Sequence, residues 1–303
     1  MAVASASSNK SQAARELKVS RASLYYEKKI PCKDDELRRT IEALMLEHPG
    51  YGYRRVAIAL GINRKRIQRV MQKYHLKPLR RAKTPKKEED FGKPARECPD
   101  ILSRLCPCVP NEVWVSDFTY IRFQGRFIYL ATVLDGLTGE VLGAHIADRH
   151  DATFVLIAIQ RAQQKEGTLP RWFHSDQGSE FNSETVAGWL IDHGTAISMS
   201  PKSSPWRNGA QESFFGRFKV EFGDVDRFST LEELVEALYL HLAYFSHDRI
   251  KNRLKMSPHD FRQRWEAKYQ QFLPTSTKIS TSYESPPQTP PRGGPPSAAV
   301  TAS

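Results

Sequence analysis

The sequence of 303 residues has no long hydrophobic run, and none approaches the roughly 18 apolar residues that a membrane-spanning helix needs. Its first residues also lack the apolar core of a secretory signal peptide. These two absences exclude a membrane-spanning protein and favour a cytoplasmic location. Hydrophobic residues make up 40% of the chain, enough for a buried core in its middle. The length suggests one large domain with one or two small modules.

Cysteine is also scarce. The chain has Cys32, Cys98, Cys106 and Cys108, and their spacing matches no standard zinc site. No Cys-x-x-Cys pair and no paired histidines accompany them. Reduced thiols are the favoured interpretation, and a zinc site among the last three cysteines is the alternative.

Positive charge is concentrated in one part of the chain. The net charge is +11, and residues 51–96 contain 15 Lys or Arg against three acids, so this segment alone carries +12. The rest of the chain is close to neutral. Such a concentration favours a polyanionic partner, because each phosphate that is neutralised releases counterions. For part of this positive charge, chiefly that of residues 83–93, the alternative is a solvated basic linker.

Residues 1–32 are expected to form a short helix-turn-helix-like segment. Residues 11–26 predict a helix, a tight turn and a second helix that Ser20 would cap. The second helix would then be the one that enters a major groove. A helical hairpin without DNA contact is the alternative.

Residues 33–77 predict a basic module of three helices. The first begins near Asp34 and carries an apolar stripe at helical spacing, and the chain turns at residues 48–50. In the third helix, residues 64–74, apolar side chains face inward and basic ones stay outside. We expect this helix to contact DNA, with a purely surface role for its charges as the alternative. The candidate DNA-binding residues are Arg54, Arg55, Arg64, Lys65, Arg66, Arg69 and Lys73.

Two segments without apolar periodicity flank the large domain. Residues 78–110 are rich in Lys, Arg, Pro and Glu, which is typical of a flexible basic linker. Residues 271–303 are rich in Pro, Ser and Thr, and seven of the chain's 19 prolines lie between Leu273 and Pro296. We expect this tail to be disordered.

Residues 111–270 predict an α/β domain. Strand-like segments at 113–123, 126–134 and 139–148 are separated by short turns, which predicts antiparallel neighbours. The elements expected after them are helix 152–166, strand 171–176, helix 183–193, strand 195–200, helix 209–221 and helix 231–246.

Three acids lie in this domain at places where an acid needs a partner. Asp117 is inside an apolar strand, Asp176 ends a second strand, and Glu212 opens a helix. A buried carboxylate without a partner loses several kcal/mol of solvation, so we interpret the three together rather than as separate bulge or surface residues. Hard divalent ions prefer carboxylate oxygens, and two ions about 3.5–4 Å apart can hold the attacking and leaving oxygens of phosphoryl transfer.

The residues around these acids form a specific pattern. Trp-Val-Ser-Asp-Phe-Thr-Tyr contains Asp117, Arg-Asn-Gly-Ala-Gln-Glu-Ser-Phe-Phe contains Glu212, and 35 residues separate Asp176 from Glu212. With Gly-Tyr-Arg-Arg before the basic helix and the segment 248–258, this pattern resembles the integrase-type Asp-Asp-Glu transposases of bacterial insertion sequences. The resemblance runs from about residue 11 to residue 265. One departure is Tyr-Phe-Ser at 244–246, where the family usually has Tyr-Asn.

The resemblance implies a ribonuclease-H-like core with a mixed five-stranded sheet, in which the first and fourth strands bring Asp117 and Asp176 together. It implies metal-dependent cleavage at the ends of a mobile element and 3′-hydroxyl strand transfer into target DNA. Mg²⁺ or Mn²⁺, as two ions, would be held by Asp117, Asp176 and Glu212. Lys219, on the same helix face as Glu212, would contact DNA.

Further expectations follow from the same resemblance. The partners would be the element's terminal repeats and target DNA, and the protein would be bacterial and nucleoid-associated and would bind them as a homo-oligomer. An upstream helix-turn-helix protein is a further candidate partner.

The sequence offers two competing acids. Asp135 and Glu180 are left out of the triad, because Asp135 precedes Gly136 in a turn and Glu180 follows Gly178 on an exposed approach. His174 is expected to pack or hydrogen-bond in its strand, with support of the metal ligands as its alternative. For the whole chain, the alternatives are a catalytically silent DNA-binding regulator and a plain metal-dependent nuclease.

Overall fold

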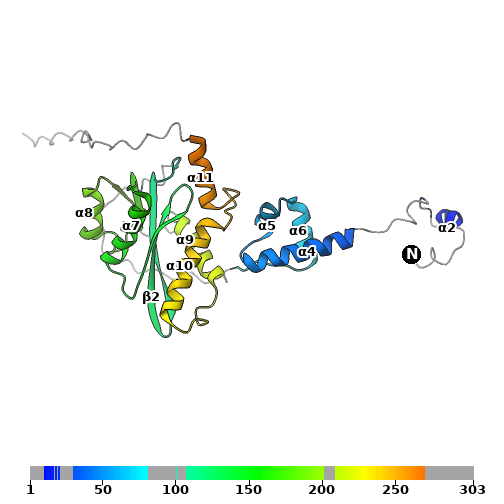
Figure 1. Cartoon of the computed structure of the whole chain (residues 1–303), viewed down its shortest axis with the longest axis horizontal. Coiled ribbons are helices and arrows are strands. Elements are labelled where there is room, and N and C mark those ends of the chain that lie inside the picture. The colour runs from blue at the N-terminus through cyan, green and yellow to red at the C-terminus, as the bar shows by residue number, and fades with distance from the viewer. Residues whose placement is uncertain are drawn as a thin grey trace, which may run out of the picture.

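The computed structural model describes residues 10–16, 18, 20, 30–80, 100, 107–200 and 209–269. They form a small helical unit of α4, α5 and α6 beside a larger unit with a β-sheet at its centre (Figure 1). A short helix, α2 (Lys10–Glu16), precedes both, and the second predicted helix of that segment lies outside the described residues. Within the described part, no helix combines the length and the apolar character that crossing a membrane would need.

The helical unit packs three helices around one small core. They are α4 (Ile30–Glu47), α5 (Tyr53–Leu60) and α6 (Arg64–Lys73), so the first begins four residues before its predicted start. Asn63 caps α6, because its side chain accepts a hydrogen bond from the Lys65 amide. The fully or nearly fully buried core consists of Leu37, Ile41, Tyr51, Val56, Ile67, Val70 and Met71.

The larger unit contains a mixed five-stranded sheet with strand order β3-β2-β1-β4-β5. The pairs β1–β2 and β2–β3 are antiparallel and joined by tight turns, whereas β1–β4 and β4–β5 are parallel and joined through helices. The strands are β1 (Val113–Phe123), β2 (Arg126–Asp135), β3 (Val141–Ala147), β4 (Trp172–Ser175) and β5 (Ala196–Met199).

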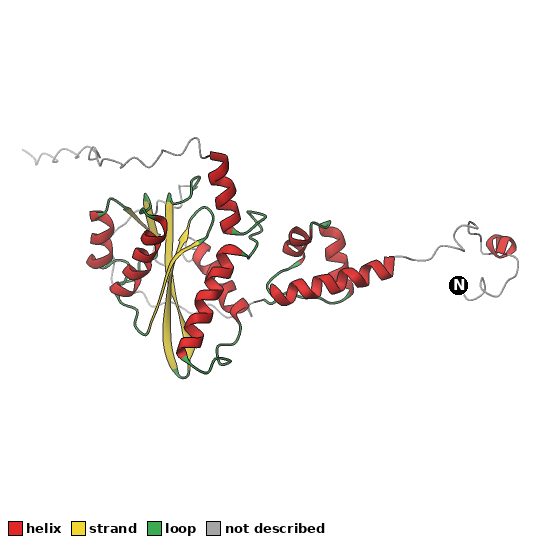
Figure 2. Cartoon of the chain, viewed as in Figure 1, coloured by secondary structure: helices red, strands yellow, loops and turns green. Residues whose placement is uncertain are grey.

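Helices cover both faces of this sheet (Figure 2). On one face, α7 (Ala152–Glu166) and α8 (Glu184–Asp192) enclose a core with Trp114 and Phe173. On the other, α9 (Gly209–Phe222) and α10 (Leu231–His247) enclose a core rich in phenylalanine. The phenylalanines of this second core are Phe123, Phe214, Phe215, Phe218, Phe222 and Phe245.

Strand order and directions are those of the ribonuclease-H-like core, so the predicted fold class is confirmed. The predicted strands and helices of this core are present, and β3 shows one of the larger shifts. It begins at Val141 rather than Gly139, because Gly139 has a left-handed φ of 66° and closes a turn by donating to the Asp135 carbonyl at 2.7 Å. Most of the predicted linker and the whole predicted tail lie outside the described residues.

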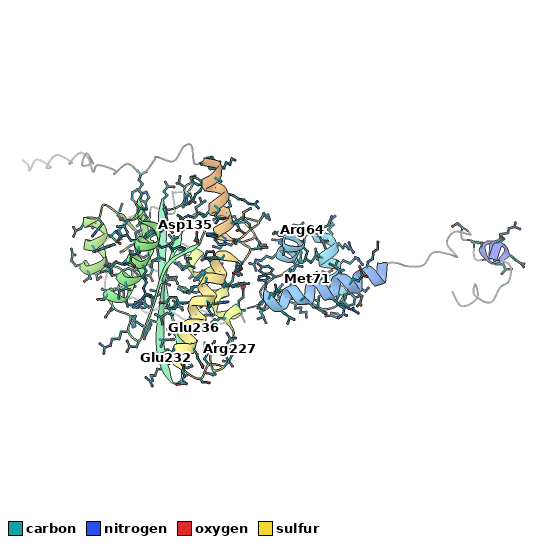
Figure 3. The ribbon with its side chains drawn as sticks, in the orientation of Figure 1. Arg64, Met71, Asp135, Arg227, Glu232 and Glu236 are labelled. Atoms are coloured by element: carbon teal, nitrogen blue, oxygen red, sulfur yellow. The ribbon has the colours of Figure 1, made fainter. Side chains whose placement is uncertain are left out.

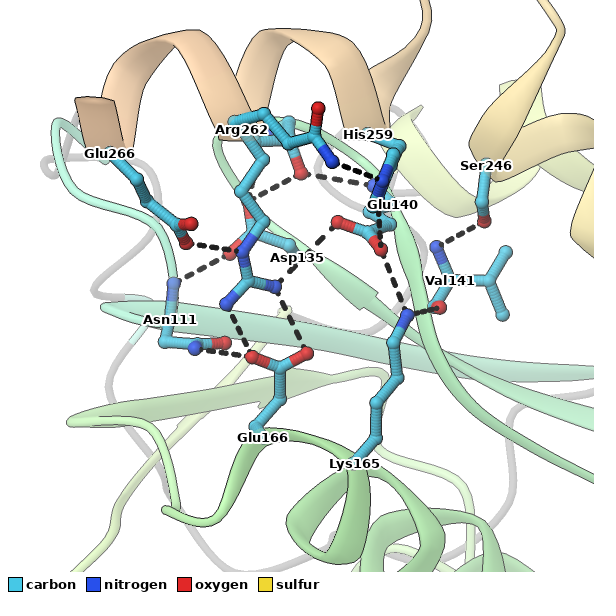
Figure 4. Close-up of polar contacts among 12 residues, drawn as sticks. Asn111, Asp135, Glu140, Val141, Lys165, Glu166, Ser246, His259, Arg262 and Glu266 are labelled. Carbon is cyan, nitrogen blue, oxygen red and sulfur yellow. Dashed lines mark hydrogen bonds and ion pairs between the residues drawn. The ribbon is translucent and has the colours of Figure 1, made fainter. Parts of the chain in front are cut away.

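The last helix, α11 (Pro258–Tyr269), is attached to one end of the sheet by buried charges (Figure 4). Arg262 forms a two-pronged pair with Glu166 and lies 3.6 Å from Glu140, to which Lys165 donates at 2.8 Å. Each buried carboxylate therefore has at least one cation against it, which offsets the cost of taking it out of water.

The turn between α4 and α5 joins the helical unit to the sheet unit. The Tyr51 hydroxyl accepts a hydrogen bond from the Ile250 amide at 2.7 Å. A Cβ atom at Gly50 would lie 2.0 Å from an oxygen of Glu221. That carboxylate cannot retreat, because both of its oxygens bind Arg249, at 2.5 and 2.7 Å. Only glycine therefore permits so close an approach.

Candidate active site

Asp117 lies within β1, and Asp176 directly follows the end of the adjacent strand β4. In the parallel pair of β1 and β4, Val115 stands opposite His174. Asp117 and Asp176 each come two residues later, and side chains two residues apart in a strand share a face. The pairing of the first and fourth strands thus places the two acids as neighbours.

Glu212 lies in the first turn of α9, whose start is held by the residue before it. Gln211 is 0% exposed; its Nε2 donates to the Val115 carbonyl at 2.7 Å, and its Oε1 accepts from the Thr132 hydroxyl at 3.3 Å. Gln211 therefore ties the start of α9 to both central strands, two residues along β1 from Asp117. This contact fixes where Glu212 stands relative to the sheet.

The three acids affect one another electrostatically. Burial, and then the negative charges of Asp176 and Glu212, raise the pKa of Asp117 to about 7, against a hydrogen bond from the Phe118 amide at 2.8 Å. The Gly178 amide donates to Asp176 at 3.0 Å. Across residues 10–269 as far as the structure describes them, no three Asp, Glu, His or Cys side chains converge closely enough to hold a metal ion.

The chemistry of these donors fits a hard divalent cation. All three are carboxylates, which are the ligands that Mg²⁺ and Mn²⁺ prefer. The raised pKa of Asp117 shows that its surroundings favour the neutral acid, a preference that a bound cation would reverse.

His174 lies in β4, two residues before Asp176, and is fully buried. Its two ring nitrogens lie 2.9 Å from the hydroxyl oxygens of Ser198 and Ser200. Burial lowers the pKa of His174 to about 4, so the ring is neutral at pH 7. It packs and hydrogen-bonds in the sheet, as the sequence predicted, with partners in β5 and directly after it.

The two competing acids have other partners. Asp135 is buried at the end of β2 and accepts hydrogen bonds from the Thr138 amide at 2.6 Å and from the Asn111 amide at 2.7 Å. Glu180 lies 2.6 Å from the ring nitrogen Nδ1 of His150. Asp135 therefore stabilises the turn that follows β2, and Glu180 pairs with His150 beside the site.

All the candidate DNA-binding residues except Arg55 are exposed, and among them Arg54, Arg64, Lys65 and Arg66 form no ion pair with an acidic side chain in the part of the chain that the structure describes. Figure 3 shows Arg64 on the outer side of the helical unit, whereas Met71 of the same helix lies against α4. These positions leave the first turn of α6 accessible to a polyanion.

Arg69 and Lys73 have a structural partner that the sequence did not indicate. Both pair with Asp34 of α4, at 2.6 and 3.4 Å, and the Asp34 side chain is buried. The hydrogen bond from Arg69, together with Lys73, holds the pKa of Asp34 below its usual value. These two basic residues therefore fasten α6 to α4.

The structure corrects the prediction for Arg55. The sequence listed it as a DNA-binding residue, but it is only 7% exposed, and its guanidinium donates to the Gly50 carbonyl at 3.0 Å. Burial lowers the pKa of Arg55 to about 10. The helical period points it inward, toward the joint between the two units, rather than toward solvent.

Lys219 lies seven residues after Glu212 in α9. Its Nζ donates to the Tyr120 carbonyl at 2.8 Å and stands 4.8 Å from the centre of the Tyr120 ring. It therefore reaches the same strand that carries Asp117. Its contact with DNA stays a prediction.

Sequence reasoning missed Gln211 and Asp34. A signal for the first was present, because Gln211 continues the inward stripe of Phe214, Phe218 and Phe222 at helical spacing. A signal for the second was the i, i+4 pair of Arg69 and Lys73, which places two cations on one face of α6. Neither signal names the partner, which lies on another element.

We expect Gln211→Leu to weaken activity while leaving the fold intact. Leucine fills a similar volume but cannot bind the Val115 carbonyl, so the start of α9 and Glu212 would lose their fixed position. Loss of such a supporting contact costs about 10–100-fold in metal affinity or activity. Titration of activity with Mn²⁺, beside thermal unfolding, measures this, with the exposed Ser213→Ala as control. An unchanged Mn²⁺ requirement would show that Gln211 only packs.

Comparison with known proteins shows that the chain contains an integrase core domain. Residues 109–205 and 212–265 match two models of the integrase core domain. The solved HTLV-2 integrase catalytic core in complex with magnesium (trimeric form) is similar, with a TM-score of 0.44 and 17% identity over 51% of this chain and 98% of that one.

Two curated relatives give the family. The protein named "Putative transposase InsK for insertion sequence element IS150" from Escherichia coli (strain K12) is 31% identical over 260 residues, 82% of this chain and 91% of that protein. The transposase for insertion sequence element IS904 from Lactococcus lactis subsp. lactis (strain IL1403) is 29% identical over 74% of this chain and 92% of that protein. The chain belongs to the integrase-type transposases of insertion sequences. In general terms it is thus a protein of DNA transposition and a polynucleotidyl transferase.

Proposed function

We propose that this transposase cleaves the ends of its own mobile element and joins the freed 3′-hydroxyls to target DNA, with Asp117, Asp176 and Glu212 as its catalytic residues. The observation that supports the proposal is the placement of the acids: β1 pairs with β4, and the negative charges of Asp176 and Glu212 act on Asp117. These acids come from three elements: β1, the end of β4 and the first turn of α9.

The same three carboxylates would hold Mg²⁺ or Mn²⁺, as two ions. Bound there, the ions would supply Lewis-acid stabilisation of the attacking and leaving oxygens of phosphoryl transfer. The chain itself positions the carboxylates: strand pairing sets Asp117 against Asp176, and Gln211 sets Glu212. No nucleophilic Ser or Tyr is required, because water and then the DNA 3′-hydroxyl attack.

DNA recognition is assigned to the helical unit and to Lys219. Exposed Arg54, Arg64, Lys65 and Arg66 supply the positive charge that phosphates require. Terminal repeats and target DNA are the proposed partners, with a homo-oligomer assembled on them and an upstream helix-turn-helix protein as a further candidate.

A strand-joining assay tests the proposed function against its two rivals. Labelled duplex with the sequence of an element end is incubated with a target plasmid. We expect both cleaved ends and joined products. Cleavage without joining would instead indicate a plain nuclease, and binding without either product would indicate a silent regulator.

The salt dependence of DNA binding tests the assignment of the basic residues. Each phosphate contact contributes roughly 0.9 to the slope of log affinity against log salt. We therefore expect Arg64→Ala with Arg66→Ala to flatten the slope by about two contacts. Arg69→Ala is the matched control, because its guanidinium is engaged with Asp34 and should alter the stability of the unit more than the slope. If Arg69→Ala flattened the slope and the double variant did not, the main phosphate contacts would lie nearer the C-terminal end of α6.

A further inference from the structure

Two large aromatic side chains stand exposed on the strands beside the candidate active site. Tyr120 of β1 is 58% exposed and Phe127 of β2 is 49% exposed. Their rings meet edge to face, with centroids 5.6 Å apart. The other aromatic residues that pack on this unit's sheet are mostly buried in its two cores. Exposing two apolar rings to water is unfavourable, and exposed apolar patches commonly mark a binding surface.

Positive charge surrounds this aromatic pair. The Nζ of Lys219 lies 4.8 Å from the centre of the Tyr120 ring. Arg122 stands directly opposite Phe127 in the strand pair, and Arg126 precedes it; both are exposed. Rings interleaved with cations suit a ligand that has flat apolar faces on an anionic backbone.

The edge of β1 next to the pair is accessible. Among the described strands, β4 pairs with β1 only from Val113 to Val115, so the strand continues past it without a neighbour on that side. Lys219 reaches around this edge from α9, on the opposite face of the sheet from the Tyr120 ring. A chain lying across the edge would therefore meet the ammonium group and the rings together.

The distance from the acids also fits DNA. Tyr120 lies three residues beyond Asp117, roughly 10 Å along an extended strand, and its ring lies on the opposite face of the sheet. A DNA strand that meets both would therefore cross the edge of β1. Bases along one strand are spaced about 3.4 Å apart, so this path takes at least about three nucleotides. A base stacked on the pair would belong to the segment that adjoins the reacting phosphate.

We propose that Tyr120 and Phe127 form a stacking platform for unpaired bases of the DNA strand that passes the active site. Lys219 and Arg122 hold the phosphates beside these bases. Unpaired bases are the fitting ligand, because bases inside a duplex already stack on one another and present no free face. The inference rests on the proposed function and names a DNA contact for that same site.

Binding of defined oligonucleotides by the full chain tests the platform. The probes are a blunt duplex and the same duplex with an overhang of about five unpaired thymidines, measured by fluorescence anisotropy in EDTA. We expect the overhang to bind more tightly. Tyr120→Leu and Phe127→Leu should each lose about tenfold in overhang affinity, in the range of one stacked base, with little change for the blunt probe. Tyr120→Phe should keep wild-type affinity, as should Ile191→Ala, the control at an exposed residue of α8.

A second measurement needs no variant. Iodouracil placed in the overhang and irradiated should crosslink to Tyr120 or Phe127, located by mass spectrometry. The platform is overturned if the leucine variants bind the overhang like wild type, if adducts form only elsewhere, or if the variants instead abolish a dimer that exists without DNA. EDTA prevents metal-dependent chemistry, so these results are independent of strand joining. A chain that joins strands but shows no overhang preference retains the proposed function and loses the platform.

Discussion

Asp117→Asn, Asp176→Asn and Glu212→Gln are each expected to reduce both cleavage and joining to below about one hundredth of the wild-type rate. Each substitution keeps the shape of the side chain and removes an anionic ligand. Loss of a residue that only supports a metal ligand costs about 10–100-fold, and loss of the ligand itself should cost more. Cleavage and joining of labelled element-end DNA measure the effect.

Glu180→Gln is the matched control, because it neutralises a carboxylate that adjoins the site but pairs with His150. It should retain most of the activity. All four variants should bind DNA within a few-fold of wild type, since the basic residues of α6 are unchanged. Substantial cleavage by any one of the three triad variants would refute the triad.

Glu221→Gln is expected to destabilise the protein by about 3–5 kcal/mol, equivalent to a fall in Tm of about 6–20 °C. Glu221 binds Arg249, whose side chain is only 2% exposed, through both oxygens. Its charge also acts on Arg55 and Arg217, which repel Arg249. One carboxylate therefore balances three neighbouring guanidinium groups, and its loss leaves them uncompensated.

Thermal unfolding of two further variants checks this explanation. Glu236→Gln removes a charge from an exposed position of α10 and should change Tm little (Figure 3). Adding Arg249→Met to Glu221→Gln should recover part of the lost stability, because it removes the buried cation that was left unpaired. If the double variant were less stable than Glu221→Gln alone, the electrostatic explanation would be wrong.

The position of Glu221 links the two halves of the molecule. It lies nine residues after Glu212 on α9, roughly 13 Å along the helix axis. One end of α9 therefore carries a proposed catalytic acid, and the other holds the turn at Gly50 that joins the helical unit.

The sheet was predictable because its determinants are local. Short turns at Gln124-Gly125 and Asp135-Gly136 fix the antiparallel hairpins, and caps such as Asn63, Asp151 and Ser183 mark helix starts. The positions of Asp117 and Asp176 followed from strand order once the fold was inferred. The resemblance, rather than periodicity, supplied that order.

Contacts between distant elements were not predictable. Arg55, Arg69 and Arg64 have the same residue type and similar surroundings in sequence, yet one is buried, one is paired and one is exposed. What separates them is the partner each meets on another element, such as Asp34. The sequence around Gly50 likewise predicts an ordinary turn glycine and does not indicate that Glu221 packs against it.

The metal dependence of strand joining tests the central claim most directly. With wild-type chain and element-end DNA, we expect joined products in Mg²⁺ or Mn²⁺, and DNA binding with little turnover in Ca²⁺, because Ca²⁺ takes longer bonds and looser geometry than the proposed site requires. Joining at equal rates in the presence of a chelator would contradict the account, since three carboxylates alone cannot stabilise the charge that develops on the reacting oxygens.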